Sequence, residues 1–174
     1  LRASVVRVDE AGRIHVVVYG YMNRGIHEGQ VGTGVYHYDG IVHTVEEEVF
    51  IPSNDSYEIL KAQMGQLLYA NEQGNLYLLM DSNVYCVNLE TLNVNRLVEN
   101  LTNSSYVVSA SNRYFAWVEG KNENSGSKIF MMDLSNGKTQ TIEESGNVYL
   151  KPLGFIDEDL IYGVAEQEEV KLDN

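Results

Sequence analysis

Residues 67–80 read LLYANEQGNLYLLM, which is an apolar run, a short polar turn and a second apolar run rich in Leu and Tyr. The same unit occurs at residues 5–18, 107–118 and 153–164. Two apolar runs joined by a tight polar turn are typical of a β-hairpin. Four copies at a spacing close to that of propeller blades predict a repeated antiparallel β-architecture.

Each copy extends into further strands of the same kind. The apolar and branched runs predict units at about residues 4–51, 67–98, 106–142 and 149–165, of which the last has only two strands. We therefore predict an all-β fold in which antiparallel four-stranded meanders form a partial β-propeller of about three and a half blades. Residues 1–174 are expected to form a single propeller-like domain, as a fragment of a longer protein.

Two local features of the sequence predict departures from plain strands. In the connecting segment 52–66, residues 57–64 place apolar side chains at roughly helical spacing, which favours a short helix or an irregular crossing. In the first unit, Asp39-Gly40 predicts a two-residue type I′ hairpin. In that register, His37 and His43 lie on opposite sides of the sheet, so they are not expected to bind one metal ion.

The third unit carries a recognisable repeat motif. Lys128-Ile129-Phe130-Met131-Met132-Asp133-Leu134-Ser135-Asn136-Gly137-Lys138 matches the loose consensus I-Y-x-x-D-L-x-x-G-K, with an echo at residues 83–95. Through these residues, the chain resembles β-propeller proteins related to the TolB C-terminal domain, and other quinoprotein-like or WD40-like propellers, over about residues 67–165. The resemblance implies a propeller fold without a particular function. An array of fewer than four blades leaves unpaired sheet edges, which favours a partner or self-association through those edges.

The composition excludes several function classes. The formal net charge of −13 repels phosphate backbones and anionic lipids, so no nucleic acid partner is expected. No apolar run is long enough to span a membrane, so direct membrane insertion of this segment is not expected either. The single cysteine, Cys86, lies between apolar neighbours and is interpreted as a buried structural thiol.

No motif for catalysis, cofactor binding or metal binding is recognised. Gly29-Gln30-Val31-Gly32-Thr33-Gly34 lacks the lysine and the following helix of a phosphate-binding loop, so its glycines indicate a bulge or a close approach of strands. The acidic turns at residues 122–127 and 157–159 offer oxygen ligands but not the spacing of an EF-hand. His15 is interpreted as a strand residue with a satisfied imidazole. No cofactor is predicted.

The candidate binding residues are tyrosines and one loop. Tyr19 and Tyr21 alternate on one strand of the first unit, and Tyr36 and Tyr38 alternate on the adjacent strand, so each strand presents two rings on one face. Such rings either stack on a sugar or peptide or pack within the sheet. The glycine-bearing loop adds side chains that either contact a ligand or are solvated: Arg24, His27 and Glu28.

These observations favour a non-catalytic recognition or sensing domain that binds a protein, a peptide or a glycan. A glycan-active hydrolase or lyase that uses rim carboxylates remains an alternative, because the separation of two catalytic carboxylates is spatial and not visible in sequence. A purely structural spacer module is a third hypothesis. The expected location is an extracytoplasmic domain of a bacterial anchored or secreted protein.

Overall fold

A computed structural model describes residues 1–119 and 125–170. The chain forms two compact units, Leu1–Glu99 and Asn100–Asn174. The prediction of one propeller-like domain concerns the joint arrangement of these units, and it stays a prediction.

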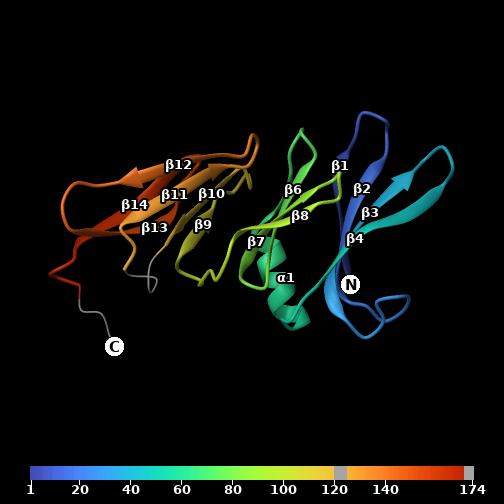
Figure 1. The fold of residues 1–174 in the computed structure, drawn as a ribbon, viewed down its shortest axis with the longest axis horizontal. Coiled ribbons are helices and arrows are strands. Elements are labelled where there is room, and N and C mark those ends of the chain that lie inside the picture. The colour runs from blue at the N-terminus through green and yellow to red at the C-terminus, as the bar shows by residue number, and fades with distance from the viewer. Residues whose placement is uncertain (120–124, 171–174) are drawn as a thin grey trace. The chain divides into compact units, whose positions relative to one another are not determined.

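The first sheet is an antiparallel meander in the order β1-β2-β3-β4 (Figure 1). Its strands are β1 (Arg2–Val8), β2 (Ile14–Tyr21), β3 (Val31–Asp39) and β4 (Thr44–Pro52). Alternation of apolar and other residues along β2 and β3 gives the sheet two different faces, as expected for a pleated strand.

The second sheet repeats the meander in the order β5-β6-β7-β8. Its strands are β5 (Leu68–Ala70), β6 (Asn75–Met80), β7 (Asn83–Asn88) and β8 (Val94–Val98). The β6–β7 hairpin closes on two residues, Asp81 and Ser82, with φ of 52° and 59°. Positive φ at both central positions is the requirement of a type I′ turn.

A helix connects the first two sheets, as the apolar spacing predicted. Helix α1 (Tyr57–Gln66) begins after Ser56, whose side chain accepts a hydrogen bond from the backbone N–H of Ile59. This side-chain cap satisfies one of the N–H groups that the first helical turn leaves free. Leu60 and Met64 are the buried residues of the helix.

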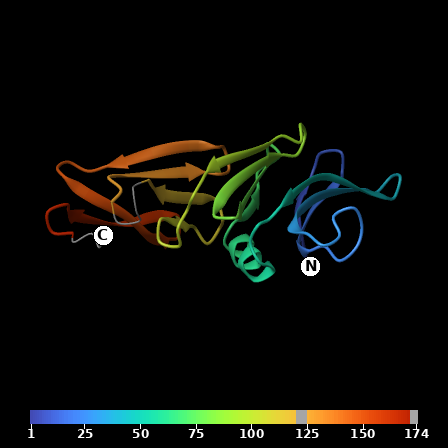
Figure 2. The same ribbon diagram turned by 60° about the horizontal axis from the view of Figure 1, so that its bottom comes forward.

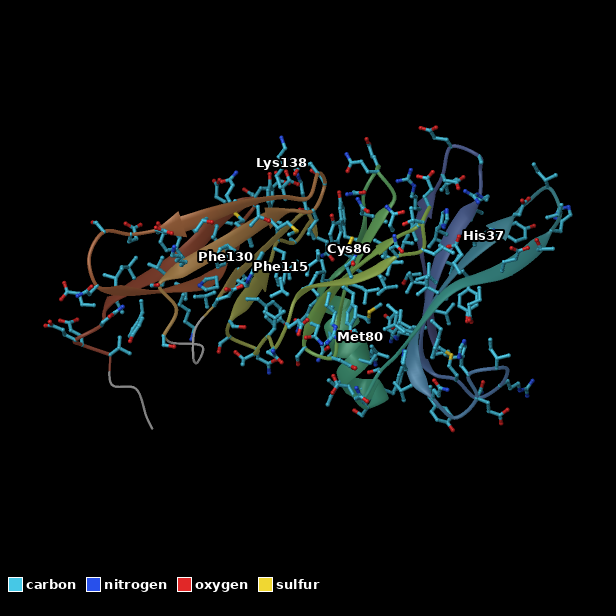
Figure 3. The ribbon with its side chains drawn as sticks, in the orientation of Figure 1. His37, Met80, Cys86, Phe115, Phe130 and Lys138 are labelled. Carbon is cyan, nitrogen blue, oxygen red and sulfur yellow. The ribbon has the colours of Figure 1, made fainter. Side chains whose placement is uncertain are left out.

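The core of the first unit lies between the first sheet, the second sheet and α1 (Figure 2). Val17 and Val35 of the first sheet are fully buried, as are Leu78 and Met80 of β6. The Thr33 hydroxyl donates to Sδ of Met80 at 3.4 Å, which ties the two sheets together across the core (Figure 3 labels Met80). One face of the first sheet is therefore fixed against the second sheet.

The second unit contains a four-stranded sheet and a two-stranded sheet. The third sheet has the order β12-β11-β10-β9, and the fourth pairs β13 with β14. Their strands are β9 (Tyr106–Val108), β10 (Tyr114–Val118), β11 (Lys128–Asp133), β12 (Lys138–Glu143), β13 (Val148–Ile156) and β14 (Asp159–Glu166).

The core of the second unit joins its two sheets. Ala116, Val118 and Ile129 of the third sheet pack with Leu150 of β13. Trp117 is buried, with its ring centroid 5.4 Å from that of Phe130 (Figure 3 labels Phe130).

The repeat motif of the third unit has a structural basis. Asp133 accepts hydrogen bonds from the guanidinium of Arg113 at 3.2 and 3.0 Å and from the backbone N–H of Ser135 at 2.9 Å. The aspartate of the motif therefore fixes the turn between β11 and β12.

The predicted fold class is confirmed. In the described part of the chain, three four-stranded antiparallel meanders and one two-stranded sheet follow one another along the sequence. The number of strands equals that of three and a half four-stranded blades.

Candidate functional site

The four candidate tyrosines lie on two different faces of the first sheet. Tyr19 pairs with Thr33, and Tyr36 pairs with Val16, so alternation sends the β2 and β3 rings to opposite sides. Tyr19 is buried in the core against the second sheet, and Tyr21 follows on the same face with 51% of its surface exposed. Tyr36 and Tyr38 lie on the opposite face. A platform of all four rings on one face does not form.

We call the face that carries Tyr36 and Tyr38 the outer aromatic face. It contains an open cavity of about 320 Å³. The cavity is lined by three adjacent strands of the first sheet, through Val16, Val18, Tyr36, His37, Tyr38 and Val45. Val45 exposes 67% of its surface, as does Val5, which pairs with Val16 on this face.

Two glycines of β3 make room for aromatic rings on this face. A Cβ on Gly34 would lie 2.5 Å from the ring of Tyr36, and a Cβ on Gly32 would lie 2.6 Å from the ring of Phe50. Real Cβ atoms do not approach other atoms this closely, so each ring lies over a position that only glycine leaves open. The interpretation that these glycines permit a close approach is therefore right, although the approaching groups are rings and not only strands.

A carboxylate links the outer aromatic face to the loop before β3. The Tyr36 hydroxyl donates to Oε2 of Glu47 at 2.7 Å, and Nε2 of His27 lies 2.7 Å from Oε1 of the same carboxylate. The ring of His27 stacks on Phe50 with a centroid separation of 3.6 Å. Two of the predicted binding residues, Tyr36 and His27, are thus brought together by Glu47.

The electrostatics of this cluster follow from its hydrogen bonds. Burial raises the pKa of Glu47, but the hydrogen bonds from His27 and Tyr36 outweigh it and hold the pKa below its usual value. Burial and the neighbouring Glu47 carboxylate raise the pKa of Tyr36 to about 12. At neutral pH, Glu47 is therefore ionised, and it accepts a hydrogen bond from the protonated phenol of Tyr36.

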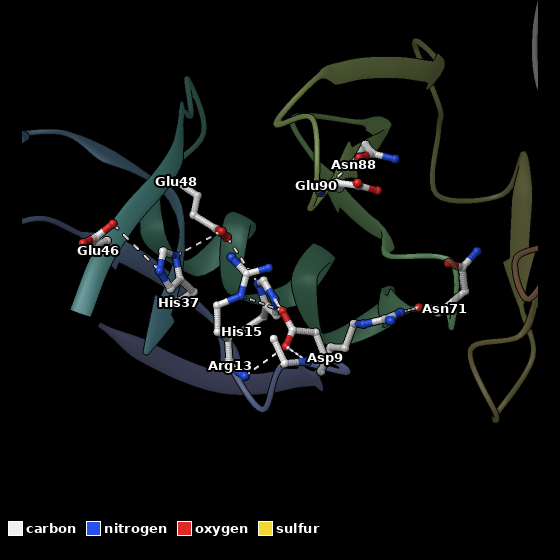
Figure 4. Close-up of polar contacts among 11 residues, drawn as sticks. Asp9, Arg13, His15, His37, Glu46, Glu48, Asn71, Asn88 and Glu90 are labelled. Carbon is white, nitrogen blue, oxygen red and sulfur yellow. Dashed lines mark hydrogen bonds and ion pairs between the residues drawn. The ribbon is translucent and has the colours of Figure 1, made fainter. Parts of the chain in front are cut away.

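The inner face of the same strands carries a second polar cluster, the histidine–carboxylate chain (Figure 4). It consists of Asp9, His15, Glu48, His37 and Glu46. Nε2 of His15 lies 3.2 Å from Asp9, and its Nδ1 lies 3.3 Å from Glu48. His37 continues the chain, with Nδ1 3.1 Å from Glu48 and Nε2 3.8 Å from Glu46.

His15 occupies the middle of this chain with 2% of its surface exposed. Each ring nitrogen of this buried imidazole lies within hydrogen-bond distance of a carboxylate oxygen. The buried Nδ1 of His37 lies 3.1 Å from Glu48 without hydrogen-bond geometry. Both nitrogens of His15 therefore have a partner, and the prediction of a satisfied His15 is confirmed.

A bulge in β4 distributes the three consecutive glutamates between the two faces. Val35 pairs with Val49 and Tyr36 pairs with Glu47, which leaves Glu48 as the extra residue. A bulged residue is released from strict alternation, and its side chain is re-aimed. Glu48 therefore turns to the inner histidines, and Glu47 stays on the outer aromatic face.

Asp9 is one end of the histidine–carboxylate chain, and it lines a cavity that reaches the second sheet. Burial raises the pKa of Asp9, but hydrogen bonds from the backbone of Arg13 and from the side chains of His15 and Arg13 lower it to about 2. A cavity of about 370 Å³ extends from here to Glu72 and Glu90 of the second sheet. The guanidinium of Arg7 donates to the backbone carbonyl of Asn71 beside it.

The predicted two-residue hairpin at Asp39-Gly40 is wrong. Asp39 pairs with Thr44, so the loop contains four residues, and His43 has a φ of 55°. The Asp39 carboxylate accepts the backbone N–H groups of Ile41 and Val42, at 2.8 and 3.3 Å, which stabilises the longer loop. His43 contacts the Tyr38 hydroxyl at 2.9 Å, and His37 belongs to the inner chain.

The other candidate residues take no part in these clusters. Arg24 and Glu28 are exposed in the loop between β2 and β3. Within residues 1–119 and 125–170, no group of three or more His, Cys, Asp or Glu side chains is arranged to hold a metal ion. Residues 122–124 of the first acidic turn lie outside the described residues.

Sequence reasoning did not identify the roles of Glu46, Glu47 and Glu48. The signal that points to them is their position opposite His37 and Tyr36 on the neighbouring strand. That signal becomes readable only in the correct register, and both the four-residue loop and the bulge shift the register.

Comparison with solved structures finds similar folds at low sequence identity. Dipeptidyl peptidase 4 from Porphyromonas gingivalis is 10% identical with a TM-score of 0.43, over 95% of this chain and 29% of that one. TolB from Acinetobacter baumannii is 13% identical with a TM-score of 0.34, over 87% and 37%. An oligogalacturonate lyase in complex with manganese is 10% identical with a TM-score of 0.36, over 95% and 59%.

The chain resembles propeller-type structures at the level of the fold, and it spans less than two thirds of each of these three chains. No protein-family model and no curated protein matches the sequence. Among the described residues, no helix has the length and apolar character needed to cross a membrane.

Proposed function

We propose that this chain is a non-catalytic recognition module and that its outer aromatic face binds a polypeptide partner. The observation that carries the proposal is the open cavity beside Tyr36 and Tyr38, whose surroundings are held in place by hydrogen bonds. Tyr36 is fixed by Glu47 and Tyr38 by His43. Rings that are already ordered lose little conformational freedom on binding, which favours affinity.

The lining of the cavity favours a polypeptide over a glycan. Val16, Val18 and Val45 offer no hydrogen-bonding group, and the hydroxyls of Tyr36 and Tyr38 already have partners. A sugar requires several directed hydrogen bonds to its hydroxyls, because burying an unpaired polar group is costly. A polypeptide presents aliphatic and aromatic side chains that the valines and tyrosines accommodate.

Selection from a phage-displayed library of random peptides tests this proposal. We expect enriched peptides whose affinity falls by roughly 30-fold or more in Tyr38→Ala, the loss typical of a truncated aromatic anchor. Tyr21→Ala is the matched control, because Tyr21 is an exposed tyrosine on the other face of the same sheet. Circular dichroism of both variants establishes that the fold is kept.

Two results overturn the proposal. Peptides that bind Tyr38→Ala as well as they bind the unaltered chain place the contact elsewhere. Binding on a glycan array that is lost in Tyr38→Ala favours carbohydrate recognition, and turnover in a panel of glycan hydrolase and lyase substrates favours the enzymatic alternative. The spacer hypothesis predicts no binding in any of these assays.

The location and assembly of the chain are further parts of the proposal. An extracytoplasmic location predicts that fractionation of the source cells finds the protein outside the cytoplasm. Self-association through open sheet edges predicts a concentration-dependent mass in analytical ultracentrifugation. On the edge strand β4, the consecutive charges at residues 46–48 oppose edge-to-edge pairing.

A further inference from the structure

We infer that the outer aromatic face selects a cationic side chain, that of lysine or arginine, from its polypeptide partner. This inference rests on the proposed function, because it names the chemistry that the same cavity recognises. Three features of the first sheet support it: a fixed carboxylate on the same face, two tyrosine rings beside an aliphatic lining, and an excess of negative charge.

The fixed carboxylate is that of Glu47. It accepts the Tyr36 hydroxyl at 2.7 Å and contacts His27 at 2.7 Å, so its position is set by groups on two different segments. Its side chain is 25% exposed, and it lies on the same face of β4 as Val45, which lines the cavity. An anion that is partly shielded from water attracts a nearby cation more strongly than a fully solvated one does.

The cavity itself suits the rest of a lysine or arginine side chain. Tyrosine ring faces attract ammonium and guanidinium groups. Both side chains also have aliphatic stems that pack along apolar surface while the charged end stays near water or an anion. In this cavity, Val16 and Val18 offer the apolar surface, and Tyr36 and Tyr38 offer the rings.

The negative charge of the surrounding strands and loops favours a positively charged partner. Residues 14–52, which span β2 to β4, contain five acidic side chains and a single arginine, Arg24. The whole chain carries a formal net charge of −13. A basic partner is attracted to this surface, whereas an acidic partner is repelled.

Short blocked peptides test the inference directly. Acetyl-Gly-X-Gly-amide, with Lys, Arg, norleucine or Glu at X, is titrated into the full chain, and the ring signals of Tyr36 and Tyr38 are followed by NMR. Norleucine keeps the aliphatic stem of lysine and removes its charge. We expect the Lys and Arg peptides to bind about five-fold more tightly than the norleucine peptide, the scale of one cation–π contact.

A pair of matched variants assigns the preference to Glu47. Glu47→Gln keeps the shape and the acceptor oxygen for Tyr36, and we expect it to reduce the preference for Lys over norleucine to the part that the tyrosine rings contribute. Glu99→Gln removes one charge at the end of the second sheet, and we expect it to leave the preference unchanged. Raising the salt concentration weakens the preference of the unaltered chain, because ions screen an exposed charge.

The outcomes separate this inference from the proposed function. Equal binding of the Lys and norleucine peptides overturns the inference and leaves polypeptide recognition standing. A preference that is undiminished in Glu47→Gln overturns the role of the carboxylate. If no peptide shifts the signals of Tyr36 or Tyr38, the inference is wrong, and the library selection then decides the proposed function by itself.

Discussion

Nδ1 of His15 lies 3.3 Å from Oε2 of Glu48, and the other oxygen of Glu48 lies 3.1 Å from His37. One carboxylate on β4 thus holds two imidazoles from β2 and β3. His15 and Glu48 are nearly excluded from solvent, with side-chain exposures of 2% and 7%. Contacts of this kind are coupled, because the loss of one partner removes one of the contacts of a side chain that stays buried.

A double-mutant cycle between His15 and Glu48 measures this coupling. We expect His15→Leu and Glu48→Gln each to lower the free energy of unfolding by about 1–3 kcal/mol. The double variant should differ from the sum of the two by about 0.5–3 kcal/mol, because each change removes the partner of the other. Urea denaturation followed by circular dichroism gives the values, and strictly additive effects would contradict the contact.

Replacement of Gly34 tests the packing of the Tyr36 ring. Gly34→Ala places a methyl group where the ring lies, so we expect a loss of about 1–3 kcal/mol in the free energy of unfolding, the usual cost of overpacking. The NMR signals of Tyr36 should shift at the same time. Gly65→Ala is the control, since nothing lies within 4 Å of a Cβ there. In helix α1 this change should be stabilising by up to about 1 kcal/mol.

The pH dependence of stability tests Asp9. Its pKa in the folded chain is about 2, below the ordinary value of 3.8. A lowered pKa contributes stability that is present above about pH 4 and is lost as the pH falls toward 2. We therefore expect Asp9→Asn to be less stable than the unaltered chain at pH 6, with a difference that shrinks toward pH 2. Glu10→Gln, in the adjacent exposed turn, is the control; an equal deficit of Asp9→Asn at both pH values would exclude the mechanism.

The ionisation of Tyr36 reports on its neighbour Glu47. Burial and the Glu47 carboxylate raise the pKa of Tyr36 to about 12, so we expect its phenol to stay protonated at pH 11. Glu47→Gln removes the nearby charge, and the pKa should fall toward 10 while the contribution of burial remains. Carbon-13 NMR of the tyrosine rings measures the change, with Tyr36→Phe to assign the signal. An unchanged pKa in Glu47→Gln would show that Glu47 does not act on Tyr36.

The fold was predictable because its strands alternate clearly and its connections are short. The β6 residues Leu76, Leu78 and Met80 face the core at every second position, and the pattern that revealed the repeat is the pattern that the core requires. Helix α1 was also visible, through the apolar spacing of residues 57–64. Trp117 lies in the apolar run at residues 107–118, and it is buried.

The polar clusters were not predictable, because they depend on register and not on composition. A two-residue turn at Asp39-Gly40 would pair Tyr36 with His43, whereas the longer loop and the bulge pair it with Glu47. The side chain of Asp39 stabilises the longer loop by accepting two backbone N–H groups, an effect that the dipeptide signal for a tight turn does not include. The tyrosine faces followed from strand alternation, but the contact of His27 with Glu47 depends on the path of a loop.

The extra residue at Glu48 has a consequence for how the first unit tolerates changes in length. If one glutamate were deleted from residues 46–48, regular pleating would return to β4, and two carboxylates would remain for His15, His37, His27 and Tyr36. Insertions in the four-residue loop between β3 and β4 would lengthen only the hairpin tip and would keep every pairing. We therefore expect insertions and deletions among related sequences to occur in the loop between β3 and β4 and not within β4.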